Sequence, residues 1–124
     1  MERLTEDHTV SRCLVELGEI TPEMLQTHPD RHRLTRFLGM REEAHADVRL
    51  CSLLPGDVLL LCSDGLTGML SETTIREILT AASDTPEGCC AALVGAANQA
   101  GGTGNVTALV IIANGDRMGG EAVR

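Results

Sequence analysis

Residues 56–67 constrain the fold of this chain most, because a short apolar run there leads directly into an acidic turn. The apolar residues Val58–Cys62 are bounded by turn formers and are too few for an independent helix, so they predict a strand buried on both faces. Asp64 follows this strand, and Gly65 permits an unusual turn. A carboxylate held there by rigid backbone suits a metal ligand or a general base. The alternative is a turn in which Asp64 bonds its own backbone.

Composition excludes several classes of function. The length of 124 residues suits one domain, and 43% hydrophobic residues with one Phe and no Trp or Tyr predict an aliphatic core. Ten basic residues against 18 acidic ones give a net charge of −8, so we expect neither nucleic acid nor an anionic membrane as a partner. All ten cations are Arg. Without Lys, the chain has neither a Walker-type phosphate loop nor a Schiff-base nucleophile.

The cysteines and the lack of a targeting segment predict a soluble, cytoplasmic protein. The five cysteines are an odd number, show no C-x-x-C spacing and lie mostly within apolar runs. They are typical of buried thiols in a reducing compartment. The sequence shows no signal peptide and no apolar run of about 20 residues, the length that spans a membrane.

Helix and strand signals are interleaved without regular βαβ alternation. Capping signals and periodicity predict helices from Thr9 or Ser11 to about Leu17, from Thr21 to Pro29, from Ser71, and from Thr85 to Gly101. Strands are predicted at residues 3–8, 34–38, 46–50, 58–62 and 106–113. Residues 46–50 alternate like a half-exposed strand, whereas residues 106–113 are apolar enough to need burial on both faces. The predicted fold class is α+β, an antiparallel sheet covered by helices.

Several motifs occur in a recognisable order between residues 4 and 112. They are Leu4-Thr5-Glu6-Asp7-His8, Glu19-Ile20-Thr21-Pro22-Glu23, Thr27-His28-Pro29, Leu34-Thr35-Arg36-Phe37-Leu38-Gly39, the stretch 56–67 with its Ser63-Asp64-Gly65 turn, and Asn105-Val106-Thr107. This order resembles the C-terminal half of the metal-dependent protein phosphatases, the PPM family of type 2C serine/threonine phosphatases, in its bacterial members. The resemblance implies that residues 1–113 form half of an α-β-β-α sandwich, followed by a flexible C-terminal tail at residues 114–124.

The resemblance also implies a metal-dependent chemistry. Family members hold two or more magnesium or manganese ions between acidic residues, and a metal-bound water attacks the phosphorus of phosphoserine or phosphothreonine. Hard divalent ions prefer oxygen ligands, and a bridged pair lowers the pKa of water while it neutralises the phosphoryl group.

Three positions of this sequence decide whether that chemistry is available. Asp64 matches the metal-ligating aspartate of the Ser-Asp-Gly motif. A second aspartate usually lies four residues later, where this chain has Gly68, and the family's closing Asp-Asn-Val-Thr motif reads Gly104-Asn105-Val106-Thr107 here. The family's N-terminal half, with its phosphate-binding Arg and Asp-Gly pair, has no match in this sequence. The resemblance therefore implies at most weak magnesium or manganese binding at Asp64 and no competent catalysis by this chain alone.

Two hypotheses of different classes follow for the function. The first is a truncated and degenerate part of a type 2C-like phosphatase that acts on phosphoproteins. The second is a pseudophosphatase module for protein interaction or dimerisation. Half of a two-sheet sandwich exposes apolar faces or strand edges, which monomers rarely tolerate. The expected partners are therefore a phosphoprotein, the missing N-terminal half or a second copy that restores the second layer.

One cationic cluster is a candidate contact for phosphate or an acidic partner. Arg31, Arg33 and Arg36 concentrate positive charge in an otherwise acidic chain. The favoured alternative is a solvated loop in which Arg36 pairs with an internal carboxylate.

Three other patterns favour structural interpretations. His28 and His32 have the spacing of helical zinc ligands, but Pro29 disfavours a helix there. Adjacent residues of a strand point to opposite faces, so Asp7 and His8 should not form a catalytic dyad. Residues 101–104 are rich in Gly but lack the basic residue and following helix of a phosphate loop, and they predict a flexible turn.

Overall fold

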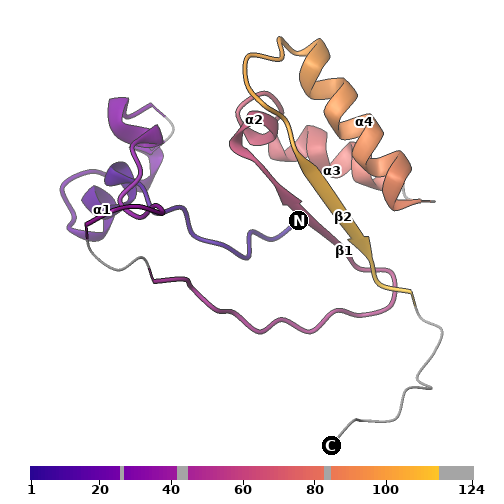
Figure 1. Cartoon of the computed structure of the whole chain (residues 1–124), viewed down its shortest axis with the longest axis horizontal. Helices are drawn as coiled ribbons and strands as arrows, with labels where there is room; N and C mark the ends of the chain where they lie inside the picture. Colours follow the sequence, from indigo (N-terminus) through magenta and orange to yellow (C-terminus); the bar gives the residue numbers. More distant parts are fainter. Residues whose placement is uncertain (26, 42–44, 83–84, 115–124) are drawn as a thin grey trace, which may run out of the picture. The chain divides into compact units, whose positions relative to one another are not determined.

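The computed structural model describes residues 1–25, 27–41, 45–82 and 85–114. The chain divides into an N-terminal unit, residues 2–50, and a C-terminal unit that begins at Cys51 and includes Met1. Helices and a small antiparallel sheet make the fold class α+β, as predicted (Figure 1). No helix in the described ranges is long and apolar enough to cross a membrane.

A two-stranded antiparallel sheet organises the C-terminal unit. Strand β1 (Val58–Cys62) pairs with β2 (Ala108–Ile112), and Leu60 lies opposite Val110 in the register. The turn before β1 is fixed by Asp57, whose carboxylate accepts a hydrogen bond of 2.7 Å from the backbone N–H of Leu54. The chain therefore enters β1 through a side-chain-stabilised turn.

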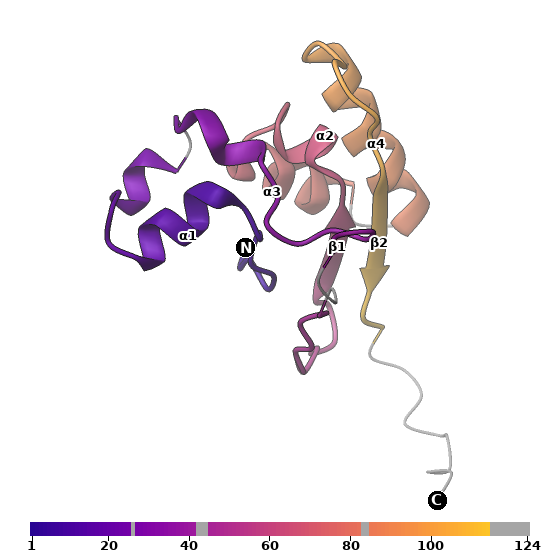
Figure 2. The same cartoon turned by 60° about the vertical axis from the view of Figure 1, so that its left-hand side comes forward.

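Three helices accompany this sheet: α2 (Asp64–Thr67), α3 (Glu72–Ala81) and α4 (Pro86–Gln99). The predicted caps are confirmed, since the hydroxyls of Ser71 and Thr85 each accept a 3.1 Å hydrogen bond from a backbone N–H in the first turn of α3 and α4, respectively. Helix α4 runs beside β2 in both views (Figures 1 and 2). The buried hydrophobic residues form the aliphatic core that composition predicted: Leu66, Leu70, Ile75, Leu79, Cys89, Leu93, Ala97 and Val110.

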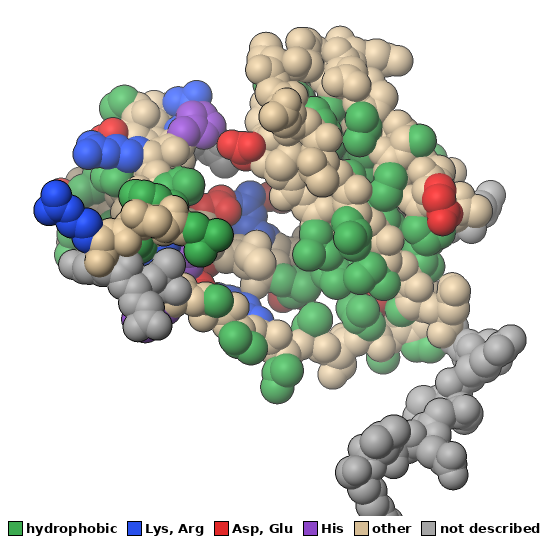
Figure 3. Space-filling model, viewed as in Figure 1, with side chains coloured by type: hydrophobic (Ala, Val, Ile, Leu, Met, Phe, Trp, Pro, Cys, Tyr) green, Lys and Arg blue, Asp and Glu red, His purple; other side chains and the backbone are tan. Residues whose placement is uncertain are grey.

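The second face of the sheet is open within this unit. The cross-strand pairs Leu59–Ile111 and Leu61–Leu109 share that face, and Leu61, Leu109 and Ile111 are 52%, 50% and 44% exposed. Figure 3 shows hydrophobic side chains gathered over the two strands. The prediction that both strands are buried on both faces is therefore wrong for this chain. The helices and the core described above cover only the opposite face.

The N-terminal unit is built from short elements. Helix α1 (Val10–Glu16) begins at Thr9, whose hydroxyl accepts a hydrogen bond of 3.3 Å from Arg12 N–H. The 3-10 helices η1 (Pro22–Met24) and η2 (Pro29–His32) follow, and η2 packs against α1. The helix predicted up to about Leu17 is confirmed.

Other predicted elements of this unit do not form. Residues 3–8 form no strand, and residues 34–38 contribute only an isolated bridge between Leu34 and Thr9. Residues 46–50 join no sheet, and the helix predicted from Thr21 is reduced to η1. A strand pattern requires a neighbouring strand, and the described part of the chain supplies none here. A helix between two prolines is also too short to overcome the cost of nucleation. Residue 26 and the predicted tail beyond Asn114 lie outside the described residues.

Close backbone packing joins the end of β1 to the loop before β2. Ser63 N–H donates to Thr107 C=O (3.1 Å), Thr107 N–H donates to Ser63 Oγ (3.0 Å), and Ser63 O–H donates to Asn105 C=O (3.0 Å). A Cβ added at Gly65 would lie 2.4 Å from the same Asn105 oxygen. This junction therefore requires glycine at position 65 for space.

Two glycine substitutions should have opposite effects on stability. We expect Gly65→Ala to lower the free energy of unfolding by about 1–3 kcal/mol, because its methyl group overlaps the Asn105 carbonyl. Gly95→Ala in α4 should instead raise it by up to about 1 kcal/mol, since a Cβ there meets nothing within 4 Å and Ala favours a helix. Urea unfolding followed by circular dichroism measures both values. A neutral Gly65→Ala variant would contradict the tight junction.

Candidate functional site

The three positions that the family resemblance links to metal binding lie at one edge of the C-terminal unit. Asp64 is the exposed first residue of α2, directly after β1, and Gly68 ends that helix with its N–H bonded to Asp64 C=O at 2.7 Å. Gly104 belongs to the loop before β2, and a Cβ there would lie 3.9 Å from Gly65 Cα. The tight junction at Gly65 therefore brings Asp64 and Gly104 close together, although 40 positions (104 − 64) separate them in sequence.

The donor set at this edge does not fit a pair of divalent ions. Asp64 supplies one carboxylate, and the two glycines supply no side-chain oxygen. Partial burial raises the pKa of the neighbouring Cys62 thiol, which disfavours its thiolate form. Among the described residues, no group of three or more His, Cys, Asp or Glu side chains could hold a metal ion. Magnesium and manganese prefer about six oxygen ligands, so this edge leaves nearly all of the coordination to water.

The Asp64 side chain is not engaged in its own turn. Within the described ranges, no hydrogen bond or ion pair holds its carboxylate, and the first turn of α2 lacks a side-chain cap. The alternative of a turn closed by this carboxylate is therefore not observed. Asp64 remains an exposed oxygen donor at the helix start.

The two glycines differ in their capacity for a side chain. Gly68 has a φ of −76°, and Gly104 is not among the glycines with positive φ. The backbone conformation therefore permits a side chain at both positions. However, a Cβ at Gly68 would lie 2.9 Å from the backbone oxygen of Asp64, whereas the nearest atom to one at Gly104 is 3.9 Å away. A carboxylate is therefore accommodated more readily at position 104.

The arginine cluster lies in the N-terminal unit and has internal partners. Arg36 Nη1 lies 3.0 Å from Asp47 Oδ1, the internal ion pair that was the favoured alternative. Arg33 pairs with Asp30 at 3.8 Å, and Arg31 donates a hydrogen bond of 3.5 Å to a backbone carbonyl. Arg36 is thus engaged in holding its own unit, while Arg31 and Arg33 are exposed on and beside η2.

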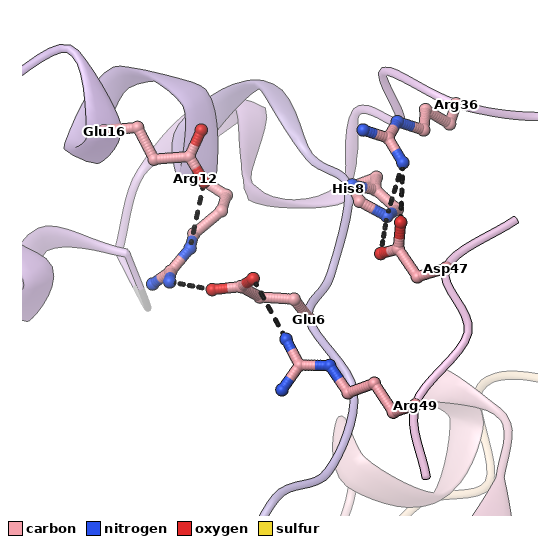
Figure 4. Close-up of polar contacts among 7 residues, drawn as sticks. All are labelled: Glu6, His8, Arg12, Glu16, Arg36, Asp47 and Arg49. Carbon is pink, nitrogen blue, oxygen red and sulfur yellow. Dashed lines mark hydrogen bonds and ion pairs between the residues drawn. The ribbon is translucent and has the colours of Figure 1, made fainter. Parts of the chain in front are cut away.

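The partners of Asp47 form a cluster that sequence reasoning missed. His8 Nε2 lies 2.7 Å from Asp47 Oδ2, and it also lies 3.2 Å from Arg36 Nη1. The hydrogen bond from His8 is the largest cause that holds the pKa of Asp47 below its usual range, and Arg36 acts in the same direction. Figure 4 shows these three side chains converging on one another. Asp7 instead pairs with Arg3 at 3.3 Å, so adjacent Asp7 and His8 have separate partners.

A second ion-pair cluster lies beside the first. Glu6 pairs with Arg12 and lies 3.5 Å from Arg49, and Arg12 also lies 3.7 Å from Glu16 (Figure 4). The alternation of Asp47 and Arg49 was the one available signal, because it places both side chains on the same side of an extended segment. Nothing local in the sequence identified residues 6 and 8 as their partners.

The histidine pair is not arranged as a metal site. His28 precedes η2, and its Nδ1 accepts a hydrogen bond of 3.1 Å from Asp30 N–H. This nitrogen caps the 3-10 helix, and the described residues place no group of three or more His, Cys, Asp or Glu where a metal ion could be held.

Comparison with known sequences identifies relatives of this chain. Residues 20–113 match the family model described as stage II sporulation protein E (SpoIIE). The protein phosphatase PhpP of Streptococcus pneumoniae is 40% identical over 113 residues, which cover 90% of this chain and 45% of PhpP. The serine/threonine phosphatase stp of Listeria monocytogenes is 37% identical over 111 residues, 90% of this chain and 44% of stp. The chain thus spans under half the length of these curated relatives.

Solved structures agree with the sequence relatives. The PPM Ser-Thr phosphatase MsPP from Mycobacterium smegmatis, crystallised with cacodylate, superposes with a TM-score of 0.78 at 43% identity, covering 92% of this chain and 48% of MsPP. The Streptococcus agalactiae serine/threonine phosphatase superposes with a TM-score of 0.79 at 36% identity, covering 88% and 45%. The match of the family model to most of the chain shows that the protein belongs to the SpoIIE family of PPM-type phosphatase domains.

Proposed function

We propose that this chain is the C-terminal part of a type 2C-like protein serine/threonine phosphatase and that it does not hydrolyse phosphoesters by itself. The observation that supports this proposal is the edge at Asp64, where glycines stand at both neighbouring positions expected to carry acids. Removing charged ligands from a metal site lowers its affinity steeply, and second-shell groups do not replace them. The relatives named as phosphatases are more than twice as long as the matched region.

A pseudophosphatase interaction module is the second candidate. It is favoured by the open sheet face, where Leu61 and Leu109 are about half exposed. A flat aliphatic face of this kind is suited to cover by a second sheet. In this alternative the chain binds a protein, such as an N-terminal half domain or a phosphoprotein, without chemistry. A cytoplasmic location is part of either proposal and is supported by five cysteines that are all free.

The two candidates are separated by activity and binding measured side by side. Hydrolysis of a phosphoserine peptide with manganese is assayed for the chain alone and after addition of the N-terminal half of PhpP. Turnover only in the mixture supports a phosphatase part that needs its other half. Binding of that half without turnover supports the module, and turnover by the chain alone contradicts both.

We expect the chain to bind manganese no more tightly than the millimolar range. One carboxylate contributes little of the affinity that several acidic ligands give to a divalent ion. Isothermal titration calorimetry should therefore give similar weak heats for the parent, for Asp64→Asn and for the exposed control Glu77→Gln on α3. A micromolar dissociation constant that is lost only in Asp64→Asn would show that further ligands complete a site.

Restoring a carboxylate should strengthen metal binding more at position 104 than at position 68. Gly104→Asp places an acid beside Asp64 without a clash, so we expect manganese affinity to rise about tenfold, because each added anionic ligand tightens a site. Gly68→Asp must first move its Cβ away from the Asp64 carbonyl, which reduces its benefit. Thr103→Asp adds the same charge one residue away and controls for general attraction.

The restored variants should still lack turnover. Positioning of the phosphoryl group supplies much of the catalysis in phosphoryl transfer, and Asp64 with two added acids provides no cationic clamp. The measurement is phosphopeptide hydrolysis by the Gly68→Asp/Gly104→Asp double variant with manganese. Robust metal-dependent turnover without an added N-terminal half would overturn the proposal that this chain is only part of an active site.

A further inference from the structure

Residues 46–50 of the N-terminal unit present an apolar side to solvent. The side chain of Asp47 points toward His8 and Arg36, and that of Arg49 points toward Glu6 (Figure 4). Between and beside them, Val48 is 85% exposed and Leu50 is 100% exposed. The alternation expected of a strand is therefore present, but the charged side faces the unit and the apolar side faces outward.

The backbone of this segment is also unpaired. Among the described residues, no backbone hydrogen bond links residues 46–50 to another segment. The ion pairs of Asp47 and Arg49 hold the segment through its side chains alone. An extended segment with free N–H and C=O groups is a template for pairing with another strand.

We propose that residues 46–50 pair in antiparallel register with the same residues of a second copy of this chain. With Val48 on the two-fold axis, Asp47 of one copy lies opposite the partner's Arg49, and Arg49 lies opposite the partner's Asp47. Ala46 then lies opposite the partner's Leu50. The segment is thus complementary to itself in charge, as an isologous interface requires.

The charge pattern of residues 46–50 favours a second copy of the chain as the binding partner. The chain has a net charge of −8, so two copies repel in most orientations. In this register each Asp47 faces an Arg49 of the other copy, so the four charges alternate in sign across the strands. The ion pairs that these residues form within their own copy lie on the same side of the strands. Val48 and Leu50 of both copies form one apolar strip on the other side.

A pair of short strands is only marginally stable, so the dimer should be weak. We expect concentration-dependent association of the parent chain in sedimentation velocity. Val48→Asp and Val48→Lys should each weaken association about tenfold or more, because a charge on the two-fold axis faces an identical charge. An equimolar mixture of the two variants should recover association, since Asp then faces Lys. Position 48 is solvent-exposed, so circular dichroism should show that both variants keep the parent fold.

Two matched controls locate the interface. Leu38→Asp adds the same charge at a residue of the same unit that is 94% exposed, and it should leave association unchanged. Leu61→Asp places the charge on the open sheet face of the C-terminal unit and should also have no effect. A parent chain that remains monomeric, a Val48→Asp variant that associates normally, or a mixture that fails to recover association would each overturn the proposal. Loss of association in Leu61→Asp alone would assign the interface to the open sheet face instead.

Discussion

The packing of Ser63 and Gly65 against residues 105–107 is the contact on which the candidate site depends. It joins the end of β1 to the approach of β2 through three hydrogen bonds of 3.0 to 3.1 Å around Ser63 and a glycine with no room for a Cβ. The same strands carry the helices and the aliphatic core on one face. Because this contact sets the register of the loop before β2, it also decides which side chains can meet at the edge.

The edge at Asp64 has the backbone arrangement that the family resemblance implied but lacks most of the side-chain oxygens that would bind metal ions. The backbone brings Asp64 and Gly104 together as the family resemblance implied, but two of the three positions are glycines and carry no ligand. A scaffold can hold its shape without metal when its stability comes from apolar burial and backbone hydrogen bonds. The C-terminal unit has both of these, so glycines at positions 68 and 104 need not unfold it. Membership of the phosphatase family is therefore compatible with the proposal that this chain does not catalyse hydrolysis by itself.

Local signals in the sequence predicted the helices well and the strands less well. Thr9, Ser71 and Thr85 act as caps in the structure because capping depends on atoms within one turn. Residues 46–50 have the alternation of a strand but no neighbouring strand among the described residues, and residues 34–38 form only a single bridge. Strand formation depends on that neighbour, which a local pattern cannot specify. The full burial predicted for β1 and β2 failed for a related reason, since the described residues of this unit supply no second layer.

In the candidate site, too, residues with a local sequence signal were predicted, whereas contacts between distant residues had no such signal. Asp64 was identifiable from its own turn, and its proximity to Gly104 came from the family resemblance rather than from spacing. The cluster of His8, Arg36 and Asp47 could not be found locally, because 39 positions separate His8 from Asp47. Pairs so distant are defined only once the chain has folded back on itself.

Ion pairs link the segment 46–50 to the rest of the N-terminal unit without a sheet. Exposed ion pairs contribute little singly, but Asp47 contacts both His8 and Arg36, and Arg49 contacts Glu6, which also pairs with Arg12. Such clusters can fix the direction of side chains without supplying backbone hydrogen bonds. The cost is that Val48 and Leu50 must face solvent, because alternate residues of an extended chain point to opposite sides. The segment therefore combines an outward-facing apolar strip with a free strand edge, and a strand that pairs with this edge extends the strip with its own side chains.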